Sequence, residues 1–180
     1  MKLFWTSPLT WIAVVVAAVL LAFAVPRSHP AMGRLPAGID QKVVQVPAAL
    51  ARADERLLLI VTFSRDHRAA AESWIQGLQL DRQAYAWVRM PVVDDPGSPA
   101  LRVQAEGRIL ARYRGEADRG NLLPLVTDRS LFLDATGVPD TRQVHVLVVN
   151  RRGDVLARVS GPFDEEKAAT VLDTLSLREL

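Results

Sequence analysis

Apolar residues follow two patterns along the chain, and the two patterns predict the order of its strands and helices. Short continuous apolar runs predict strands from their length and their β-branched or aromatic residues. These runs lie at 57–63, 84–90, 121–128, 144–150 and 154–160. Apolar residues at helical spacing predict helices at 68–80, 100–113, 129–136 and 164–177. Alternating strands and helices followed by a hairpin predict an α/β fold, with a mixed sheet flanked by helices.

Two prolines and one glycine refine this prediction. The strand at 84–90 is expected to end before Pro91, and Pro124 inside the run at 121–128 indicates a short strand or an edge strand. Gly137 is expected to close the helix at 129–136 as a C-terminal cap. The aromatic side chains expected in the core or at its edge are Trp74, Tyr85, Trp87 and Phe132.

The first 25 residues carry a membrane-targeting pattern. An uninterrupted apolar run extends from Trp11 to Val25, and Lys2 precedes it. A retained anchor needs about 20 apolar residues, which the run reaches only if the apolar residues before it extend the helix. A cleaved signal peptide suits a shorter run, and Ala22-Phe23-Ala24 matches a cleavage site. Residues 1–25 are therefore predicted either as an N-terminal hydrophobic helix, a signal anchor, or as a signal peptide.

Residues 26–42 are predicted as a linker, and 43–180 as the folded domain. Three prolines and two glycines lie between positions 26 and 38, with few apolar residues. We expect such a stretch to bury no core. Basic residues stand on both sides of the apolar run, so the membrane orientation stays open. The signal-like position of the run favours a body outside the cytoplasm.

The amino-acid composition excludes one chemistry and one class of partner. The chain contains no cysteine, and thiol–disulfide exchange needs both a thiolate and a second sulfur. Its 22 basic and 20 acidic residues are spread along the chain and give a formal net charge of +2. Nucleic-acid binding uses a clustered basic face instead. We therefore expect neither thiol redox activity nor a nucleic-acid partner.

Residues 55–176 resemble the thioredoxin-like superfamily. The segments that carry the resemblance are Phe63-Ser64-Arg65-x-His67 with Trp74, Leu125-Val126-Thr127-Asp128 before Phe132, Gly137-Val138-Pro139-Asp140, and His145 to Gly153. More narrowly, the chain is similar to bacterial relatives of the mitochondrial ATP synthase assembly factor ten family, which is poor in cysteine. The resemblance implies a thioredoxin-like sheet and a role in assembling a membrane complex. Together with the N-terminal apolar run, it suggests a bacterial inner-membrane protein with a periplasmic body, or a secreted or periplasmic protein if the signal is cleaved.

The sequence departs from the thioredoxin pattern at a second position besides the missing cysteines. Thioredoxins place a cis-proline just before the strand that corresponds to 144–150, where this chain has Arg142 or Gln143. In that superfamily the proline positions substrates beside the redox site. Its loss argues against thiol substrates binding here in the usual way.

The candidate binding surface is the tetrapeptide Arg65, Asp66, His67 and Arg68. It lies where the strand at 57–63 leads into the first helix, and the resemblance places the partner-facing surface of the superfamily there. The nearby segment 91–99 is expected to extend this surface. Ser64 or Asp66 is expected to cap the helix, and His67 to be an exposed residue of its first turn.

The same turn contains the residue types of a catalytic triad, but not the arrangement. Ser64, Asp66 and His67 are close in sequence, whereas triads assemble from distant positions around a histidine bonded to both partners. No catalytic residue is predicted. The three histidines are far apart in sequence, so no metal site is predicted either. No cofactor is expected, and His145 is predicted to be a hydrogen-bonded structural residue.

These observations predict a membrane-tethered, non-redox binding module that docks a protein partner, with the partner belonging to a membrane complex under assembly. Two other classes stay open. The domain could be a non-thiol enzyme, for instance a hydrolase or a peroxidase-like relative that uses Ser64 and His67. It could also be a permanent structural subunit of a complex.

Overall fold

The computed structural model describes residues 31–36, 56–82, 85–113 and 120–176. Its strands are β1 (Gly33–Arg34), β2 (Arg56–Thr62), β3 (Trp87–Asp94), β4 (Leu125–Thr127), β5 (His145–Asn150) and β6 (Asp154–Ser160). Its helices are the 3₁₀ turn η2 (Arg65–His67), α3 (Arg68–Gly77), α4 (Pro99–Arg112), α5 (Arg129–Thr136) and α6 (Glu165–Ser176). The apolar run at 11–25 lies outside the described residues.

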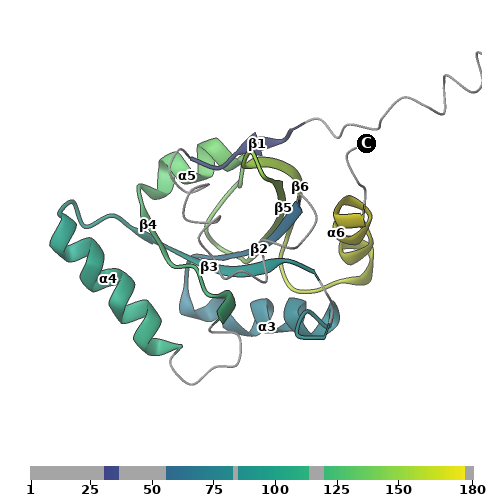
Figure 1. The fold of residues 1–180 in the computed structure, drawn as a ribbon, viewed down its shortest axis with the longest axis horizontal. Coiled ribbons are helices and arrows are strands. Elements are labelled where there is room, and N and C mark those ends of the chain that lie inside the picture. The colour runs from purple at the N-terminus through teal and green to yellow at the C-terminus, as the bar shows by residue number, and fades with distance from the viewer. Residues whose placement is uncertain (1–30, 37–55, 83–84, 114–119, 177–180) are drawn as a thin grey trace, which may run out of the picture. The chain divides into compact units, whose positions relative to one another are not determined.

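The strands form one mixed six-stranded sheet in the order β1-β6-β5-β2-β3-β4 (Figure 1). Strands β2, β3 and β4 are parallel, whereas β5 pairs antiparallel with β2, and β6 and β1 continue antiparallel. The order β6-β5-β2-β3, with a helix after β2 and after β6, is the connectivity of a thioredoxin-like fold. The predicted mixed sheet flanked by helices is therefore confirmed.

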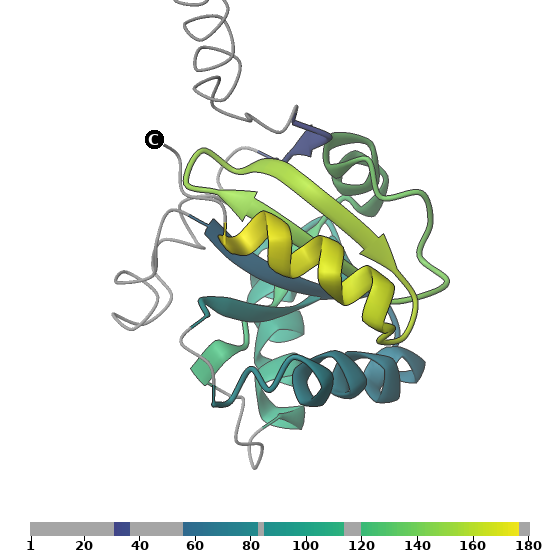
Figure 2. The ribbon, with the colours of Figure 1, turned by 90° about the vertical axis from the view of Figure 1, so that its right-hand side faces the viewer.

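Strand β2 is the centre of the core because both of its faces are buried. Leu59 and Val61 pack on one face with Phe132 of α5. Leu58 and Ile60 pack on the other face with Trp74 of α3 and with α6. Figure 2 shows α6 crossing over the β5–β6 hairpin on that face. A strand buried on both sides has a continuous apolar sequence, which is the pattern that predicted it.

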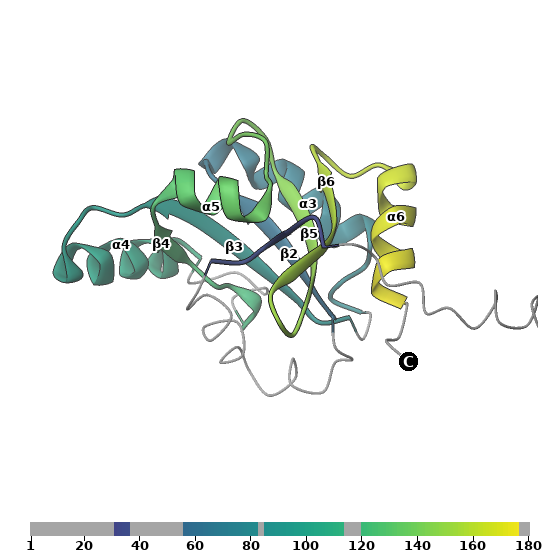
Figure 3. The same cartoon turned by 90° about the horizontal axis from the view of Figure 1, so that it is seen from above.

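Helix α4 is a peripheral element on the β4 side of the molecule, opposite to α6 (Figure 3). Ile109 is its only buried residue. At the end of α4, the Tyr113 ring lies 4.8 Å from the guanidinium carbon of Arg89. The Arg89 side chain comes from β3, is fully buried, and pairs with Glu72 of α3 at 2.7 Å. A single buried arginine therefore connects α3, β3 and the end of α4.

Two predictions in this region need correction. Strand β3 does not end before Pro91 but continues to Asp94. The β4 ladder starts opposite Val92, so Pro91 lies beside the start of a short edge strand, where a missing backbone donor is tolerated. Tyr85 is 38% exposed and does not belong to the core, because it precedes β3. Trp74, Trp87 and Phe132 are buried as predicted.

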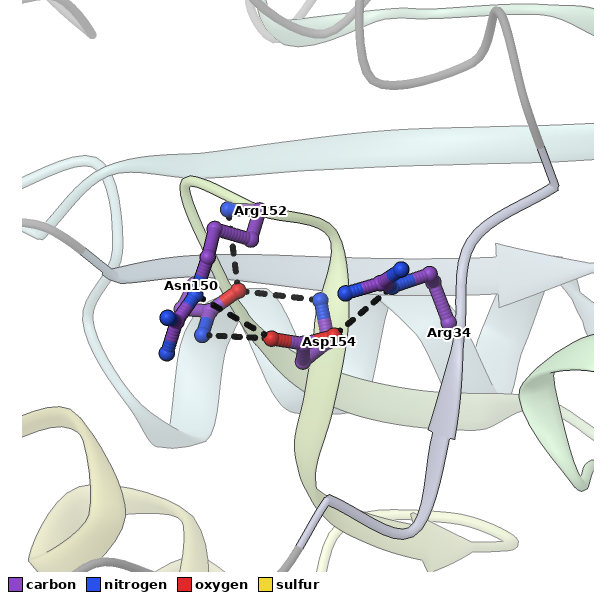
Figure 4. A network of polar contacts seen from close by, with 4 residues as sticks. All are labelled: Arg34, Asn150, Arg152 and Asp154. Carbon is purple, nitrogen blue, oxygen red and sulfur yellow. Dashed lines mark hydrogen bonds and ion pairs between the residues drawn. The ribbon is translucent and has the colours of Figure 1, made fainter.

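The segment expected to be a linker contributes a strand to the sheet. Strand β1 pairs with β6, and Leu35 is only 4% exposed and packs in the core on the α5 face. Figure 4 shows the polar contacts that fix this strand: Asp154 accepts from Arg34 Nε at 2.8 Å and from Asn150 Nδ2 at 3.1 Å. The contacts with Asn150 and Arg34 lower the pKa of Asp154. The body therefore begins inside the Pro/Gly-rich stretch.

None of the helices in the described part of the chain combines the length and the apolar composition that crossing a membrane requires.

A matched pair of glycine substitutions tests the docking of β1. A Cβ at Gly33 would lie 2.7–2.8 Å from the backbone of Ala135 and Thr136, so Gly33→Ala should lower the free energy of unfolding by about 1–3 kcal/mol. At Gly107, inside α4, no described atom lies within 4 Å of an added Cβ. Gly107→Ala should raise the free energy of unfolding by up to about 1 kcal/mol through helix propensity. Chemical denaturation measures both values, and equal effects of the two substitutions would contradict the docking of β1.

Candidate functional site

The candidate surface lies at the edge of the sheet where the parallel strands end. The carboxyl ends of β2 and β3 meet at this edge, and β5 starts there because Val61 pairs with His145 in the antiparallel ladder. The turn at 64–67 leads from β2 into α3. Residues from distant parts of the sequence therefore surround the predicted tetrapeptide.

Ser64 fixes the start of the turn. Its backbone is extended, with φ −137° and ψ 162°, and its Oγ accepts a hydrogen bond from the backbone N–H of Asp66 at 3.2 Å. The same hydroxyl donates to Asp66 Oδ2 at 3.1 Å. The expectation that Ser64 acts as a cap is confirmed for η2, whereas α3 itself has no side-chain cap. The result is a short, hydrogen-bonded turn that presents the Asp66 carboxylate at the surface.

His67 does not occupy the exposed position expected for it. Its side chain is turned into the protein, and the residue is only 6% exposed. The backbone N–H of Phe63 donates to His67 Nδ1 at 3.2 Å. A neutral ring that accepts at Nδ1 carries its proton on Nε2. His67 is therefore buried because it satisfies a backbone donor that the end of β2 leaves without a sheet partner, a contact with no signature in the sequence.

Ser64, Asp66 and His67 share one turn but do not form a relay. The Ser64 hydroxyl bonds to Asp66, and the Nδ1 lone pair of His67 is used by Phe63. A triad histidine instead takes a proton from the nucleophile with one nitrogen and donates to the acid with the other. The contacts of this turn are those of a cap and of a backbone bond.

The other three residues of the tetrapeptide, Arg65, Asp66 and Arg68, are exposed. The turn therefore displays two guanidinium groups and one carboxylate, with His67 beneath them. The predicted extension at 91–99 reaches the surface only from Asp94 onward, since Pro91 and Val92 are buried in β3. The candidate surface is thus the turn at 64–68 together with the segment at 94–98.

Acidic side chains at 94–98 and at the start of α5 lie close together, although the two segments are far apart in the sequence. Arg102 Nε donates to Asp95 at 2.7 Å and lowers the pKa of that carboxyl. Arg129 pairs with Asp94 at 3.1 Å. Asp128 caps α5, and its bonds from Ser130 and Leu131 lower its pKa. Arginines and backbone donors occupy these carboxylates, and the described residues contain no group of three or more ligands suited to a metal ion.

An aromatic cluster lies beneath the turn, in which Phe132 and His145 are fully buried and Phe63 is partly buried. The Phe63 ring meets the Phe132 ring edge to face, with the centroids 6.1 Å apart, and it meets the His145 ring at the same distance. His145 is fully buried, and its Nδ1 lies 2.9 Å from Ser160 Oγ. The prediction of a hydrogen-bonded structural histidine is confirmed. The sequence does not indicate that this histidine contacts Phe63, the residue just before the turn.

Among known proteins, only solved structures were found to be similar to this chain, and their sequence identity to it is low. No protein-family model matches the chain, and no curated protein matches it at a significant level. Among solved structures, it is similar to the exposed lipoprotein thioredoxin of Streptococcus pneumoniae strain TIGR4, with 16% identity, 69% of this chain and 88% of that chain covered, and a TM-score of 0.44. It is also similar to BsSco, a member of the Sco family of cytochrome c oxidase assembly proteins, with 16% identity, 69% and 82% covered, and a TM-score of 0.43. A peroxiredoxin-like protein from Aquifex aeolicus has 14% identity, 68% and 74% covered, and a TM-score of 0.39.

At these sequence identities and TM-scores, the activity, substrates and partners of the similar proteins cannot be assigned to this chain. The assignment to the thioredoxin-like class rests on the strand order and the connections described above. The narrower resemblance to ATP synthase assembly factors stays a prediction.

Two substitutions of His67 test its role in the turn. His67→Leu fills similar space but leaves the Phe63 N–H without an acceptor, which should lower the free energy of unfolding by about 1–3 kcal/mol. His67→Asn offers an amide oxygen near the position of Nδ1 and should recover most of that loss. Denaturant titration of both variants measures the difference. Equal stability of the two variants would show that the hydrogen bond does not hold the turn.

Proposed function

We propose that this chain is a membrane-tethered, non-redox thioredoxin-like binding module that assists the assembly or biogenesis of a membrane protein complex. The observation that carries the proposal is the turn at 64–68. It stands at the carboxyl end of the central strand, displays Arg65, Asp66 and Arg68 to solvent, and belongs to a chain without cysteine. The groups exposed there are charges and hydrogen-bond donors, which suit recognition of a partner.

The chemistry of the turn indicates what the partner presents. Two guanidinium groups flank one carboxylate, so a complementary segment carries acidic side chains with a donor between them. Arginine binds carboxylates in a bidentate geometry that fixes orientation. Binding through such exposed charges should weaken as the salt concentration rises.

The tether is proposed from the sequence together with the position of β1. The apolar run ends at Val25, and the first described residues begin at position 31. An extended chain spans at most about 3.5 Å per residue, so the few residues between the run and β1 would hold the body within about 25 Å of a membrane. Confinement near a surface raises the effective concentration of a membrane-bound partner. A role in assembly is supported by the resemblance of the sequence alone.

Replacement of one exposed arginine tests the docking surface. Full-length protein with a C-terminal tag is extracted from membranes of its host in mild detergent, and co-purifying proteins are quantified. Arg65→Glu should reduce recovery of the specific partner about tenfold or more, which corresponds to about 1.4 kcal/mol, without changing the melting temperature. Arg151→Glu is the matched control, since Arg151 is also exposed but lies in the β5–β6 turn.

The other outcomes separate the alternatives. A partner retained equally by both variants would contradict docking at the turn. Co-purification at a fixed stoichiometry, in a complex that stays associated at high salt concentration, would support a permanent structural subunit instead. A purified activity lost in His67→Asn with the fold intact would support a non-thiol enzyme.

A further inference from the structure

His145 is a buried titratable group that the proposed docking surface does not use. It is the first residue of β5, and its ring is enclosed between β6 and the start of the 64–67 turn. Ser160 Oγ lies 2.9 Å from Nδ1, whereas Nε2 is buried and makes no hydrogen bond to a described residue within 3.5 Å. Nε2 therefore lacks a hydrogen-bond partner among the described residues whichever tautomer the neutral ring adopts, and burial costs the charged ring more than the neutral one.

Three titratable or charged groups act on the His145 ring: Arg158 of β6, His67 of the turn, and Asp140 in the segment before β5. Burial lowers the pKa of His145, and Arg158 of β6 and His67 of the turn act in the same direction. The backbone and carboxylate of Asp140 act in the opposite direction. The Asp140 carboxylate is shared with Arg142, which donates to it at 2.8 Å. The neutral ring is therefore favoured in the closed structure.

The His145 ring is connected to the turn through Phe63. The Phe63 ring fits between Phe132 and His145, with both centroid distances 6.1 Å. The backbone N–H of the same residue bonds to His67 Nδ1, the contact that fixes the turn. A movement of the His145 ring toward water or toward Asp140 removes one side of the Phe63 packing. The Phe63 ring then loses one of its two edge-to-face partners, and the backbone N–H that bonds to His67 belongs to the same residue.

From this geometry we propose that protonation of His145 releases the turn at 64–67, so that acidification weakens binding at the docking surface. The effect on binding rests on the proposed function, whereas the conformational step does not. Its direction follows from the linkage between protonation and structure. Because the pKa of buried His145 lies below its ordinary value of 6.5, the open form binds the proton more strongly. The closed turn is fully favoured above about pH 6.5 and is lost as the pH falls below that value.

A single fluorescent probe tests the step, and the absence of cysteine makes labelling specific. Full-length protein carrying Arg65→Cys is labelled with an environment-sensitive fluorophore and titrated from pH 8 to pH 5. We expect an emission change with a midpoint below pH 6.5 while the far-UV circular dichroism stays constant. The change should disappear in Arg65→Cys/His145→Gln and persist in Arg65→Cys/His67→Asn. The matched variants assign the transition to His145 and not to His67.

Nuclear magnetic resonance titration provides a second readout that needs no change at position 145. The chain has three histidines, so the ring signals can be assigned with His29→Asn and His67→Asn. The His145 ring should titrate with the same midpoint as the fluorophore. A transition that persists in the His145→Gln variant, that is absent altogether, or that coincides with loss of circular dichroism would overturn the proposal. None of these readouts requires the partner. Failure to capture a partner at neutral pH would therefore count against the proposed function and not against the conformational step.

Discussion

The burial of β2 on both faces is the constraint on which the rest of the structure depends. Its side chains alternate between a core shared with α5 and a core shared with α3 and α6. Because β3 and β5 pair with its two edges, the strand can meet solvent only where it leaves the sheet. The chain turns at Ser64, where it leaves the sheet. The backbone N–H groups of Phe63 and Asp66 then need acceptors outside the sheet. Ser64 Oγ and His67 Nδ1 supply them.

The position of the turn after β2 determines which groups the candidate site contains. A thioredoxin-like fold gathers the ends of parallel strands at one edge, where groups from distant parts of the sequence meet. In this chain the groups gathered there are arginines, carboxylates and two buried histidines. The arginines and Asp66 are exposed and suit recognition. The histidines lie underneath, and their contacts with Phe63 connect the protonation state of the interior to the shape of the surface.

Local signals in the sequence were sufficient for much of the fold. The hairpin at 144–160 and helix α5 appear as predicted, and Gly137 closes α5 with φ 66°. The continuous apolar run at 57–63 also leads into a turn and a helix, as predicted. These features depend on residues that are neighbours in the chain.

Features that depend on distant residues were not predictable in the same way. Strand β1 is only two residues long and exists because β6 offers a free edge. His67 is buried because of the backbone N–H of Phe63, and the sequence shows its polarity but not that contact. Arg89 lies in an apolar run, and the sequence does not indicate that Glu72 and Tyr113 lie beside it. In each case a long-range pairing overrides the local preference.

Site-specific photo-crosslinking in host membranes tests the central claim most directly. A photoreactive amino acid is placed at position 65 in one full-length protein and at position 151 in another, and crosslinked products are identified by mass spectrometry. We expect position 65 to capture one protein of a membrane complex and position 151 not to capture it. The same products from both positions, or products from position 151 alone, would contradict a binding surface at the end of β2.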